Sequence, residues 1–579
     1  MQDVRASPMT TLAPPVGLFL GGAAAPLRAG VRRASRFLVV FALFAAVTAV
    51  LFWQCLPHLG SALIGPPEDN MQDYWNSWYA ATATHPDFFF TTLIRFPQGT
   101  WLHYHSFDYP QIALLILLTK IVGTSQASLV LLQNLTLLLT FPLSGAGAFY
   151  LARHFTRSDV AGAVGGFVFA FNPSHVAQAL HHAHVASIEF LPVFVLCYLL
   201  ALEKKSFGWL GGAILFWTLS ALSCWYYLFY AGYFVIFHAV YLRVRDNKLP
   251  AGWRLFAPLA GAAGTALLLA PLIIPMMREA SDPGIYGSGG NTFVADLAGY
   301  LAFPPAHLLG SWTRGLYASF TGNPWEATVY LGLVNVAALV FLWLRTRPAG
   351  DPVLRYVLWG MLVFCVLASG ECLHVAGHVL TYLHLPDVVL SKLPFVANVR
   401  GPSRAIVMVY LFLGIGVGRA AALAWEDRHG PVLGGVLAAA AVLLLLDYYP
   451  ADLPMTPVAC PAGLAAIESD PEQGFGVLDL PGGYVEGNAA MLAQTCHGRP
   501  IAQGNVSRRV VATLADQLDI RDLDAQRRQL AAARIKYIVI ARPRDGMFAW
   551  QAADGPRDLY PRRYPLVYDG PERTVLRVY

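Results

Sequence analysis

Apolar residues occur along this chain in long blocks that are separated by short polar stretches. The first block runs from Phe37 to Leu56, within a helix expected at roughly 36–57. Further apolar helices are expected near 127–152, 159–172, 186–202, 207–223, 225–242, 255–276, 328–345, 354–370, 403–422 and 431–449. A helix of about 20 apolar residues crosses a bilayer. The pattern therefore predicts a mainly α, polytopic membrane protein with about eleven transmembrane helices.

Basic residues at the ends of these blocks predict the orientation of the chain. The segment 1–35 holds Arg5, Arg28, Arg32 and Arg33, which indicates a cytoplasmic basic tail. The transmembrane region is then 36–449 and carries a large outer loop, 58–126. Within that loop the apolar run 112–122 is too short to span comfortably, so we expect a re-entrant or interfacial helix there.

The last part of the chain, 450–579, predicts a small extracytoplasmic α/β domain. Its strand-like runs are Gly476 to Leu480, Tyr537 to Ile540 and Thr574 to Tyr579. The stretch from Ser507 to Arg534 has helical periodicity, with Ser507 as the expected N-cap. Cys460 and Cys496 form a disulfide or stay free, and the sequence leaves both open.

Composition agrees with a membrane protein and excludes two other classes. Only 13% of the 579 residues are charged, against about 25% in a soluble protein. Acidic and basic residues are balanced in the C-terminal part, so we expect no nucleic-acid partner. The chain has no GxxxxGK[ST] phosphate loop, so a cytoplasmic nucleotide-driven engine is not indicated.

The polar loop from Pro66 to Pro110 holds the strongest candidates for chemistry. Glu68, Asp69 and Asp73 lie within six residues, directly after the first apolar block. Such carboxylates accept a proton from a hydroxyl, or hold a divalent cation such as Mg²⁺ or Mn²⁺ through Asp69 and Asp73. The competing interpretation is an ordinary polar loop in which an acidic residue caps a helix.

A histidine cluster and a pair of arginines supply candidate substrate contacts. His181 and His184 can share a helix face with a polar cavity, beside His175 and His182. Arg400 and Arg404 stand at the outer mouth of a predicted span, where guanidinium groups bind phosphate. In both cases the alternative is an interfacial side chain with no special role.

Three further residues complete the set of candidates. Arg95 is a second phosphate-binding candidate, and Glu326, just before a predicted span, is placed to orient a sugar hydroxyl. Trp75 is a candidate for stacking on a sugar face, although aromatic residues are expected at every membrane interface.

Several motifs resemble the GT-C superfamily of integral membrane glycosyltransferases. The first-loop segment Glu68-Asp-Asn-Met-Gln-Asp-Tyr-Trp-Asn76 is similar to bacterial, family-39-like members. The stretches at 96–100, 171–175, 326–332, 400–404 and 497–500 also look like that group. The resemblance implies a polyprenyl-phosphate-linked sugar as donor, taken on the outer side, and an inverting transfer. It implies Asp69 as the catalytic carboxylate, with Asp73 or Glu68 as second choice. Some members of the superfamily use a divalent cation.

The sequence thus predicts a glycosyltransferase in a bacterial inner membrane. Its acceptor is an envelope glycan, a lipid or a protein, and the C-terminal domain guides that acceptor. The alternative is a polytopic transporter or lipid-handling protein without transferase activity. Ionisable residues crowd the outer loops and no symmetry between halves is evident, which favours the enzyme.

Overall fold

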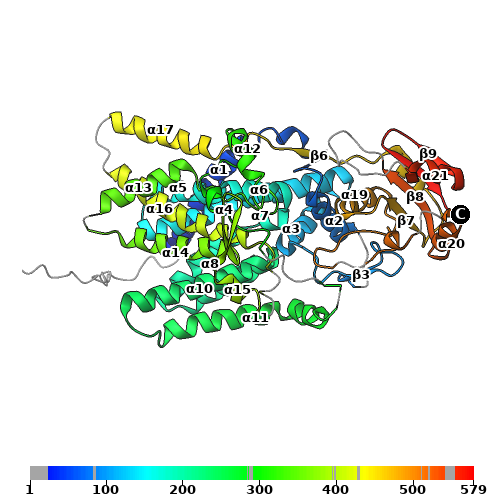
Figure 1. Ribbon diagram of the computed structural model, residues 1–579. Coiled ribbons are helices and arrows are strands. Elements are labelled where there is room, and N and C mark those ends of the chain that lie inside the picture. Colours follow the sequence, from blue (N-terminus) through cyan, green and yellow to red (C-terminus); the bar gives the residue numbers. More distant parts are fainter. Residues whose placement is uncertain are drawn as a thin grey trace, which may run out of the picture.

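The computed structural model describes residues 24–579 except 83–86, 283, 286–290, 348, 394–395, 397–398, 427–430, 510–511, 519–521 and 542–554. The predicted tail 1–35 lies mostly outside the described residues. The molecule is elongated: a bundle of helices fills one end, and a small sheet with flanking helices fills the other (Figure 1). Helices α2 (Asp69–Thr82) and α3 (Tyr109–Val122) of the first outer loop lie between them.

Every predicted apolar block coincides with a helix of the bundle. These helices are α1 (Ala24–Leu51), α4 (Gln126–Thr156), α5 (Asp159–Ala170), α8 (Phe190–Lys204), α9 (Phe207–Ser223), α10 (Trp225–Asp246), α11 (Trp253–Glu279), α13 (Leu333–Thr346), α14 (Pro352–Ala368), α16 (Ile406–Glu426) and α17 (Pro431–Asp447). Within the described residues, 7 helical segments are long and apolar enough to cross a membrane. The protein is a multi-pass membrane protein, and the number of spans stays a prediction.

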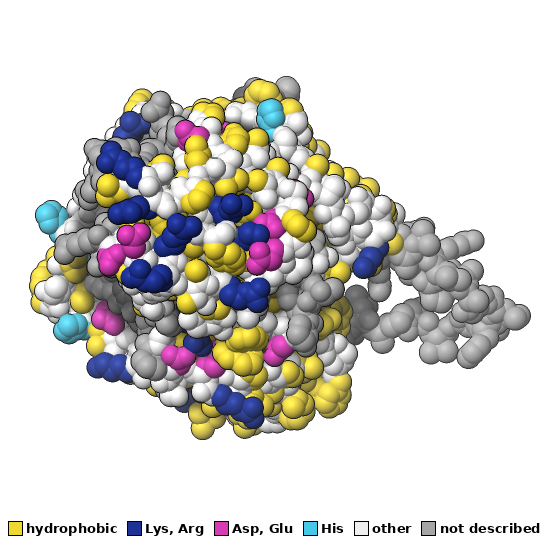
Figure 2. All heavy atoms as spheres, turned by 90° about the vertical axis from the view of Figure 1, so that its right-hand side faces the viewer, with side chains coloured by type: hydrophobic (Ala, Val, Ile, Leu, Met, Phe, Trp, Pro, Cys, Tyr) yellow, Lys and Arg dark blue, Asp and Glu magenta, His cyan; other side chains and the backbone are white. Residues whose placement is uncertain are grey.

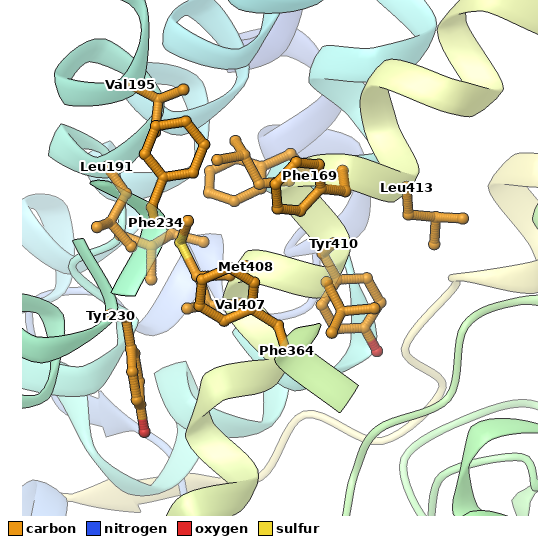
Figure 3. Packing of buried hydrophobic residues seen from close by; sticks show 14 of the residues in the cluster. Phe169, Leu191, Val195, Tyr230, Phe234, Phe364, Val407, Met408, Tyr410 and Leu413 are labelled. Carbon is orange, nitrogen blue, oxygen red and sulfur yellow. The ribbon is translucent and has the colours of Figure 1, made fainter. Parts of the chain in front are cut away.

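Helix α16 runs through the centre of the bundle and is buried along almost its whole length. Figure 3 shows its residues Val407, Met408 and Tyr410 packed among side chains from neighbouring helices, Phe169 and Phe364 among them. A helix that is apolar all round needs such a position. Glycines let α5 approach closely: a Cβ on Gly165 would lie 2.7 Å from the carbonyl oxygen of Gly414.

Short elements lie in the loops that connect the helices of the bundle. They are η1 (Leu56–His58), β1 (Ala62–Ile64), β2 (Phe90–Thr91), β3 (Thr100–Trp101), α6 (Pro173–His181), α7 (Ala183–Ala186), η2 (Leu297–Tyr300), α12 (Gly310–Tyr317), β4 (Cys372–Val375), β5 (His378–His384), α15 (Asp387–Leu390) and η4 (Pro402–Ala405). The helix expected at 112–122 is present as α3, capped by the side chain of Asp108. Its depth in the membrane stays a prediction.

The C-terminal domain is a four-stranded mixed sheet with helices. The strand order is β7 (Gly476–Leu480), β8 (Ile535–Ala541), β10 (Arg573–Arg577) and β9 (Leu566–Asp569), and only the β7–β8 pair is parallel. All three predicted strands are therefore confirmed. The other elements are β6 (Met455–Pro457), α18 (Ala462–Glu468), α19 (Tyr484–His497), η5 (Ala515–Gln517), α20 (Leu523–Ala532) and α21 (Gly555–Arg563). Its outward face carries interspersed basic and acidic side chains (Figure 2).

The predicted helix from Ser507 to Arg534 is wrong over its first half. In the described part of this stretch, α20 begins only at Leu523, where the Asp522 side chain caps it by accepting from the backbone of Ala525. The hydroxyl of Ser507 lies 2.7 Å from the hydroxyl of Ser106 and 3.1 Å from the side-chain nitrogen of Gln72. Ser507 thus contacts the first outer loop, and Asp522 is the residue that caps α20.

The first outer loop and the C-terminal domain form one structural unit. Strand β1, just after the first span, pairs with β6, just after the last apolar helix. Residues of both parts share one hydrophobic core, in which Trp75, Ile94 and Phe107 meet Phe475 and Val477. A disulfide joins Cys460 to Cys496. The site described next lies between the bundle and this structural unit.

Candidate active site

A polar cavity of about 130 Å³ lies where the bundle, the first outer loop and the C-terminal domain meet. Its polar lining comes from seven separate segments of the chain. The ionisable and hydroxyl residues that line it are Asp69, Tyr104, His105, Ser106, His182, His184, Ser223, Tyr226, Arg400, Arg404, Tyr484, Ser507 and Arg508. Asp69, His184, Arg400 and Arg404, all predicted from the sequence, therefore share this one cavity.

Asp69 is the first residue of α2 and presents its carboxylate to the cavity. One oxygen accepts a hydrogen bond of 3.1 Å from the side-chain amide of Asn488. The other lies 3.3 Å from Nε2 of His182. Burial opposes ionisation here, but the hydrogen bond and charge of His182, with the charge of His184, lower the pKa of Asp69 below its usual value. The carboxylate is therefore ionised at neutral pH and can accept a proton.

A chain of polar contacts connects Asp69 to a buried ion pair. Nδ1 of His182 lies 2.8 Å from the side-chain oxygen of Gln178 and 3.7 Å from the carboxylate of Glu326. Glu326 in turn holds Arg404 through Nε, at 3.0 and 3.1 Å, and through a terminal nitrogen. Although burial would raise it, the charge and hydrogen bonds of Arg404 lower the pKa of Glu326 to about 2. Glu326 thus positions Arg404 rather than lining the cavity.

Tyr226, at the start of α10, brings the cationic groups of the cavity together. The guanidinium of Arg404 lies over its ring, 4.7 Å from the ring centroid. Its hydroxyl accepts from a guanidinium nitrogen of Arg508 at 3.1 Å and from the backbone nitrogen of Arg400 at 3.3 Å. Two guanidinium groups, those of Arg404 and Arg508, therefore meet at Tyr226, and Arg400 and Asp69 line the same cavity. Such a cluster suits a phosphate group.

The other two acidic candidates lie behind Asp69 and do not line the cavity. Asp73 accepts a hydrogen bond of 2.9 Å from the backbone nitrogen of Ala183, and its second oxygen lies 3.6 Å from Nδ1 of His184. Glu68 lies 2.9 Å from Nδ1 of His181. Both carboxylates therefore hold the histidine segment against α2.

Trp75 and Arg95 are placed away from the cavity. Trp75 is completely buried, stacks on Tyr79 at 4.8 Å and donates from its indole nitrogen to Gln494. Arg95 donates to the backbone oxygens of Gly504 and Arg509, which ties the first loop to the C-terminal domain. We assign both residues to the structural unit that frames the cavity.

The carboxylates do not fit a metal ion. Within the described residues, no group of three or more histidine, cysteine, aspartate or glutamate side chains is arranged to hold one. The carboxylate oxygens of Asp69 contact Asn488 and His182, and one oxygen of Asp73 accepts from the backbone of Ala183.

Several lining residues carry no signal in the sequence. Tyr226 follows a break between two helices that reads as one apolar run, and Tyr484 and Arg508 come from the distant C-terminal domain. His105 is fully buried with Nε2 2.7 Å from the side-chain oxygen of Asn76, and burial lowers its pKa to about 3. Among these additional lining residues, only His182 had a signal in the sequence, because it belongs to the histidine cluster.

The chain was compared with known proteins at the levels of sequence and fold. Residues 37–448 match the model of a family described as "Domain of unknown function (DUF6311)". No curated protein matches the chain. The narrower likeness to family-39-like transferases stays a prediction.

Solved structures with a similar fold include three membrane glycosyltransferases. Archaeal oligosaccharyltransferase AglB from Archaeoglobus fulgidus, in complex with an inhibitory peptide and a dolichol-phosphate, is 10% identical with a TM-score of 0.51, over 88% of this chain and 70% of that one. ArnT from Cupriavidus metallidurans, bound to undecaprenyl phosphate, is 12% identical with a TM-score of 0.51, over 93% of this chain and 98% of that one. Arabinofuranosyltransferase AftD from Mycobacteria is 14% identical with a TM-score of 0.54, over 93% of this chain but only 40% of that one.

At these identities the likeness concerns the fold, and it covers both the bundle and the outer region. The family model covers most of the chain, from the first apolar helix to the end of α17. The chain therefore belongs to the family described as a domain of unknown function (DUF6311), and it has the fold of the GT-C membrane glycosyltransferases.

Proposed function

We propose that this protein transfers a sugar from a polyprenyl-phosphate donor to the hydroxyl group of an acceptor. The observation that carries the proposal is the cavity itself, which combines the Asp69 carboxylate with the arginines Arg400, Arg404 and Arg508. A proton acceptor and a phosphate-binding group are the two things that such a transfer needs. The lipid phosphates bound by AglB and ArnT agree with a donor of this class.

The proposed reaction is a single displacement at the anomeric carbon of the donor sugar. The acceptor oxygen forms a bond to that carbon while the bond from the carbon to the phosphate oxygen breaks. The acceptor proton passes to Asp69, and the phosphate leaves with the bonding electrons, stabilised by the arginine cluster. Attack opposite to the departing phosphate inverts the anomeric configuration.

The remaining predicted residues support this arrangement from behind. Glu326 keeps the Arg404 guanidinium at the cavity edge, and Tyr226 stacks beneath it. Asp73 fixes the start of α7 and thereby the histidine segment. The C-terminal domain contributes Tyr484, Ser507 and Arg508 to the lining, so it is suited to guide the acceptor. We place the reaction on the outer side of a bacterial inner membrane, with an envelope glycan, lipid or protein as acceptor.

The test is sugar transfer by the purified chain in detergent, with labelled polyprenyl-phosphate sugars as donors. Asp69→Asn keeps the shape of the side chain and removes the proton acceptor, so transfer should fall by about 100- to 10,000-fold. Asp452→Asn is a matched control, because Asp452 is exposed and does not line the cavity. Its activity should equal that of the unaltered chain.

Two outcomes would contradict the proposal. Full transfer by Asp69→Asn would remove the assigned base. Uptake of substrate into proteoliposomes without any covalent product would indicate a transporter instead. The cavity favours the enzyme over the transporter, because its charged groups gather where the bundle meets the C-terminal domain.

A further inference from the structure

A second cavity, of about 260 Å³, lies on the other side of the histidine segment. Its lining is proline-rich and aromatic. One wall is a single face of α6, made by Pro173, Val176, Ala177 and Leu180, which recur at helical spacing. The rest of the lining is His181, Pro304, Pro305, Ala306, His307, Pro324, Trp325, Thr328, Tyr448, Tyr449 and Pro450.

Two pairs of consecutive residues separate this cavity from the polar one. On the apolar side, the ring of His181 stacks on Trp325 with centroids 4.0 Å apart and planes 8° from parallel. On the other side, His182 lies 3.7 Å from Glu326 and 3.3 Å from Asp69. We call these four residues, His181, His182, Trp325 and Glu326, the dividing wall.

The surroundings of the apolar cavity are those of a membrane boundary. Tyr448 and Tyr449 directly follow α17, and the hydroxyl of Tyr449 accepts from the indole nitrogen of Trp53, just beyond the end of α1. Trp53 is 58% exposed, and Trp312 on the nearby α12 is 77% exposed. Tryptophan and tyrosine gather at the level of lipid headgroups.

The lining favours an apolar chain over a sugar. A sugar ring carries hydroxyl groups that must all find hydrogen-bond partners when they are buried, and this lining is mostly aliphatic and aromatic carbon. Two buried donors of the lining, however, have no acceptor among the described residues: the indole nitrogen of Trp325, and Nε2 of His307, whose Nδ1 accepts from the backbone of Leu309. A ligand oxygen at the head of an apolar chain would satisfy either of them.

We propose that this cavity binds the chain of a membrane lipid, with an ester or phosphate oxygen of that lipid accepting from Trp325. The volume suits a segment of chain rather than a whole lipid, since pockets for complete small ligands are about 300–1,000 Å³. Both an isoprenoid chain and a fatty acyl chain have this chemistry. The proposal concerns binding and does not depend on the proposed transfer reaction.

Photolabelling of the full chain in nanodiscs tests the proposal. One arm uses a phosphatidylcholine with a diazirine in its acyl chain, and the other uses geranylgeranyl phosphate with a diazirine in its isoprenoid chain. After irradiation, label from at least one probe should map to 173–181, 304–309 or 448–450. The probe that labels identifies the kind of chain that the cavity accepts.

Two variants fill the cavity from opposite walls. Ala177→Trp and Ala306→Trp should each lower this labelling by about tenfold, which corresponds to a loss of roughly 1.4 kcal/mol in binding. Ala459→Trp, at an exposed position outside the cavity, should leave it unchanged. The second filling variant keeps the test valid if one substitution prevents folding. Trp325→Phe keeps an aromatic ring but removes the donor, and should lower labelling by about fivefold.

Absence of label from all three segments with both probes would overturn the proposal, as would labelling that neither filling variant reduces. Unchanged labelling in Trp325→Phe would overturn the assigned hydrogen bond. Because labelling needs no turnover, its failure is distinguishable from loss of sugar transfer. Labelling of Asp69→Asn at the level of the unaltered chain would support two separate sites.

Discussion

The two faces of the dividing wall are built from neighbouring residues yet offer opposite environments. His182 and Glu326 face carboxylates and a guanidinium, whereas the ring faces of His181 and Trp325 stack on each other beside prolines and tyrosines. His181 meets a carboxylate only through Nδ1, which lies 2.9 Å from Glu68. One residue of displacement along the chain decides which face a side chain joins. The polarity of each face is therefore set by the partners that its residues contact, because both faces use a histidine. Substitutions on the polar face should therefore lower the free energy of unfolding more than substitutions on the apolar face.

Removal of the Glu326 carboxylate should give the largest loss of stability. Glu326→Ala leaves the buried guanidinium of Arg404 without its counter-charge, so the free energy of unfolding should fall by about 3–5 kcal/mol. Chemical denaturation in detergent measures it. The double variant Glu326→Ala/Arg404→Leu should recover much of the loss. Glu468→Ala, at an exposed position, should change stability by less than about 0.5 kcal/mol.

Acid should weaken the polar face in a defined pH range. Folding lowers the pKa of Glu326 from 4.5 to about 2. This carboxylate therefore stabilises the fold fully above pH 4.5, and the contribution of about 3 kcal/mol is lost as the pH falls towards 2. The difference in unfolding free energy between the unaltered chain and Glu326→Gln should shrink between about pH 5 and pH 3. A difference that stays constant would mean that the pKa of Glu326 is the same in the folded and unfolded chains.

Asp73 holds the chain just after the dividing wall, at Ala183, and its removal should lower the free energy of unfolding less than that of Glu326. Asp73→Ala leaves the buried backbone N–H of Ala183 without its acceptor, which costs about 1–3 kcal/mol. Asp73→Asn keeps a side-chain oxygen and should lose less. Thermal unfolding of the two variants, measured side by side, checks the order. Equal losses would indicate that the charge, and not the hydrogen bond, stabilises this position.

The apolar face should tolerate change best. His181→Leu removes the stacking on Trp325 and the contact with Glu68, and should lower the free energy of unfolding by about 1 kcal/mol. Sugar transfer should stay within a few-fold of the unaltered chain, because the leucine still fills the wall and His182 is untouched. A loss larger than that of Glu326→Ala would break the comparison between the two faces.

The sequence predicted the elements whose cause is local. Apolar length alone marks helices such as α4 and α16, and short apolar runs mark β7 and β8. Asp69, His184, Arg400 and Arg404 were also predicted, because positions at the ends of spans on the same side of the membrane tend to meet. What the sequence could not give was the approach of distant segments. Tyr226 and Arg508 reach the cavity only through tertiary packing, and the residues next to them in the sequence do not predict this position.

Aromatic and basic residues of the first outer loop show a second limit of prediction from the sequence. Trp75 and Arg95 have the composition expected of an interface, and the sequence cannot tell an interfacial tryptophan from a buried one. The structure buries Trp75 against Gln494 and commits Arg95 to backbone carbonyls of the C-terminal domain. Both partners lie some 400 positions later in the chain, at separations of 419 and 414. Such contacts leave no trace in a local pattern.

The pairing of β1 with β6 has a consequence for biosynthesis. A ribosome makes β1 early and β6 late, so the first outer loop must wait with half a hydrophobic core while the whole bundle is inserted. Residues 464–578 then supply the missing half, and the polar cavity gains Tyr484 and Arg508 only at that moment. A chain that a stop codon ends just after β6 would therefore insert its whole helix bundle but lack the C-terminal part of the polar cavity.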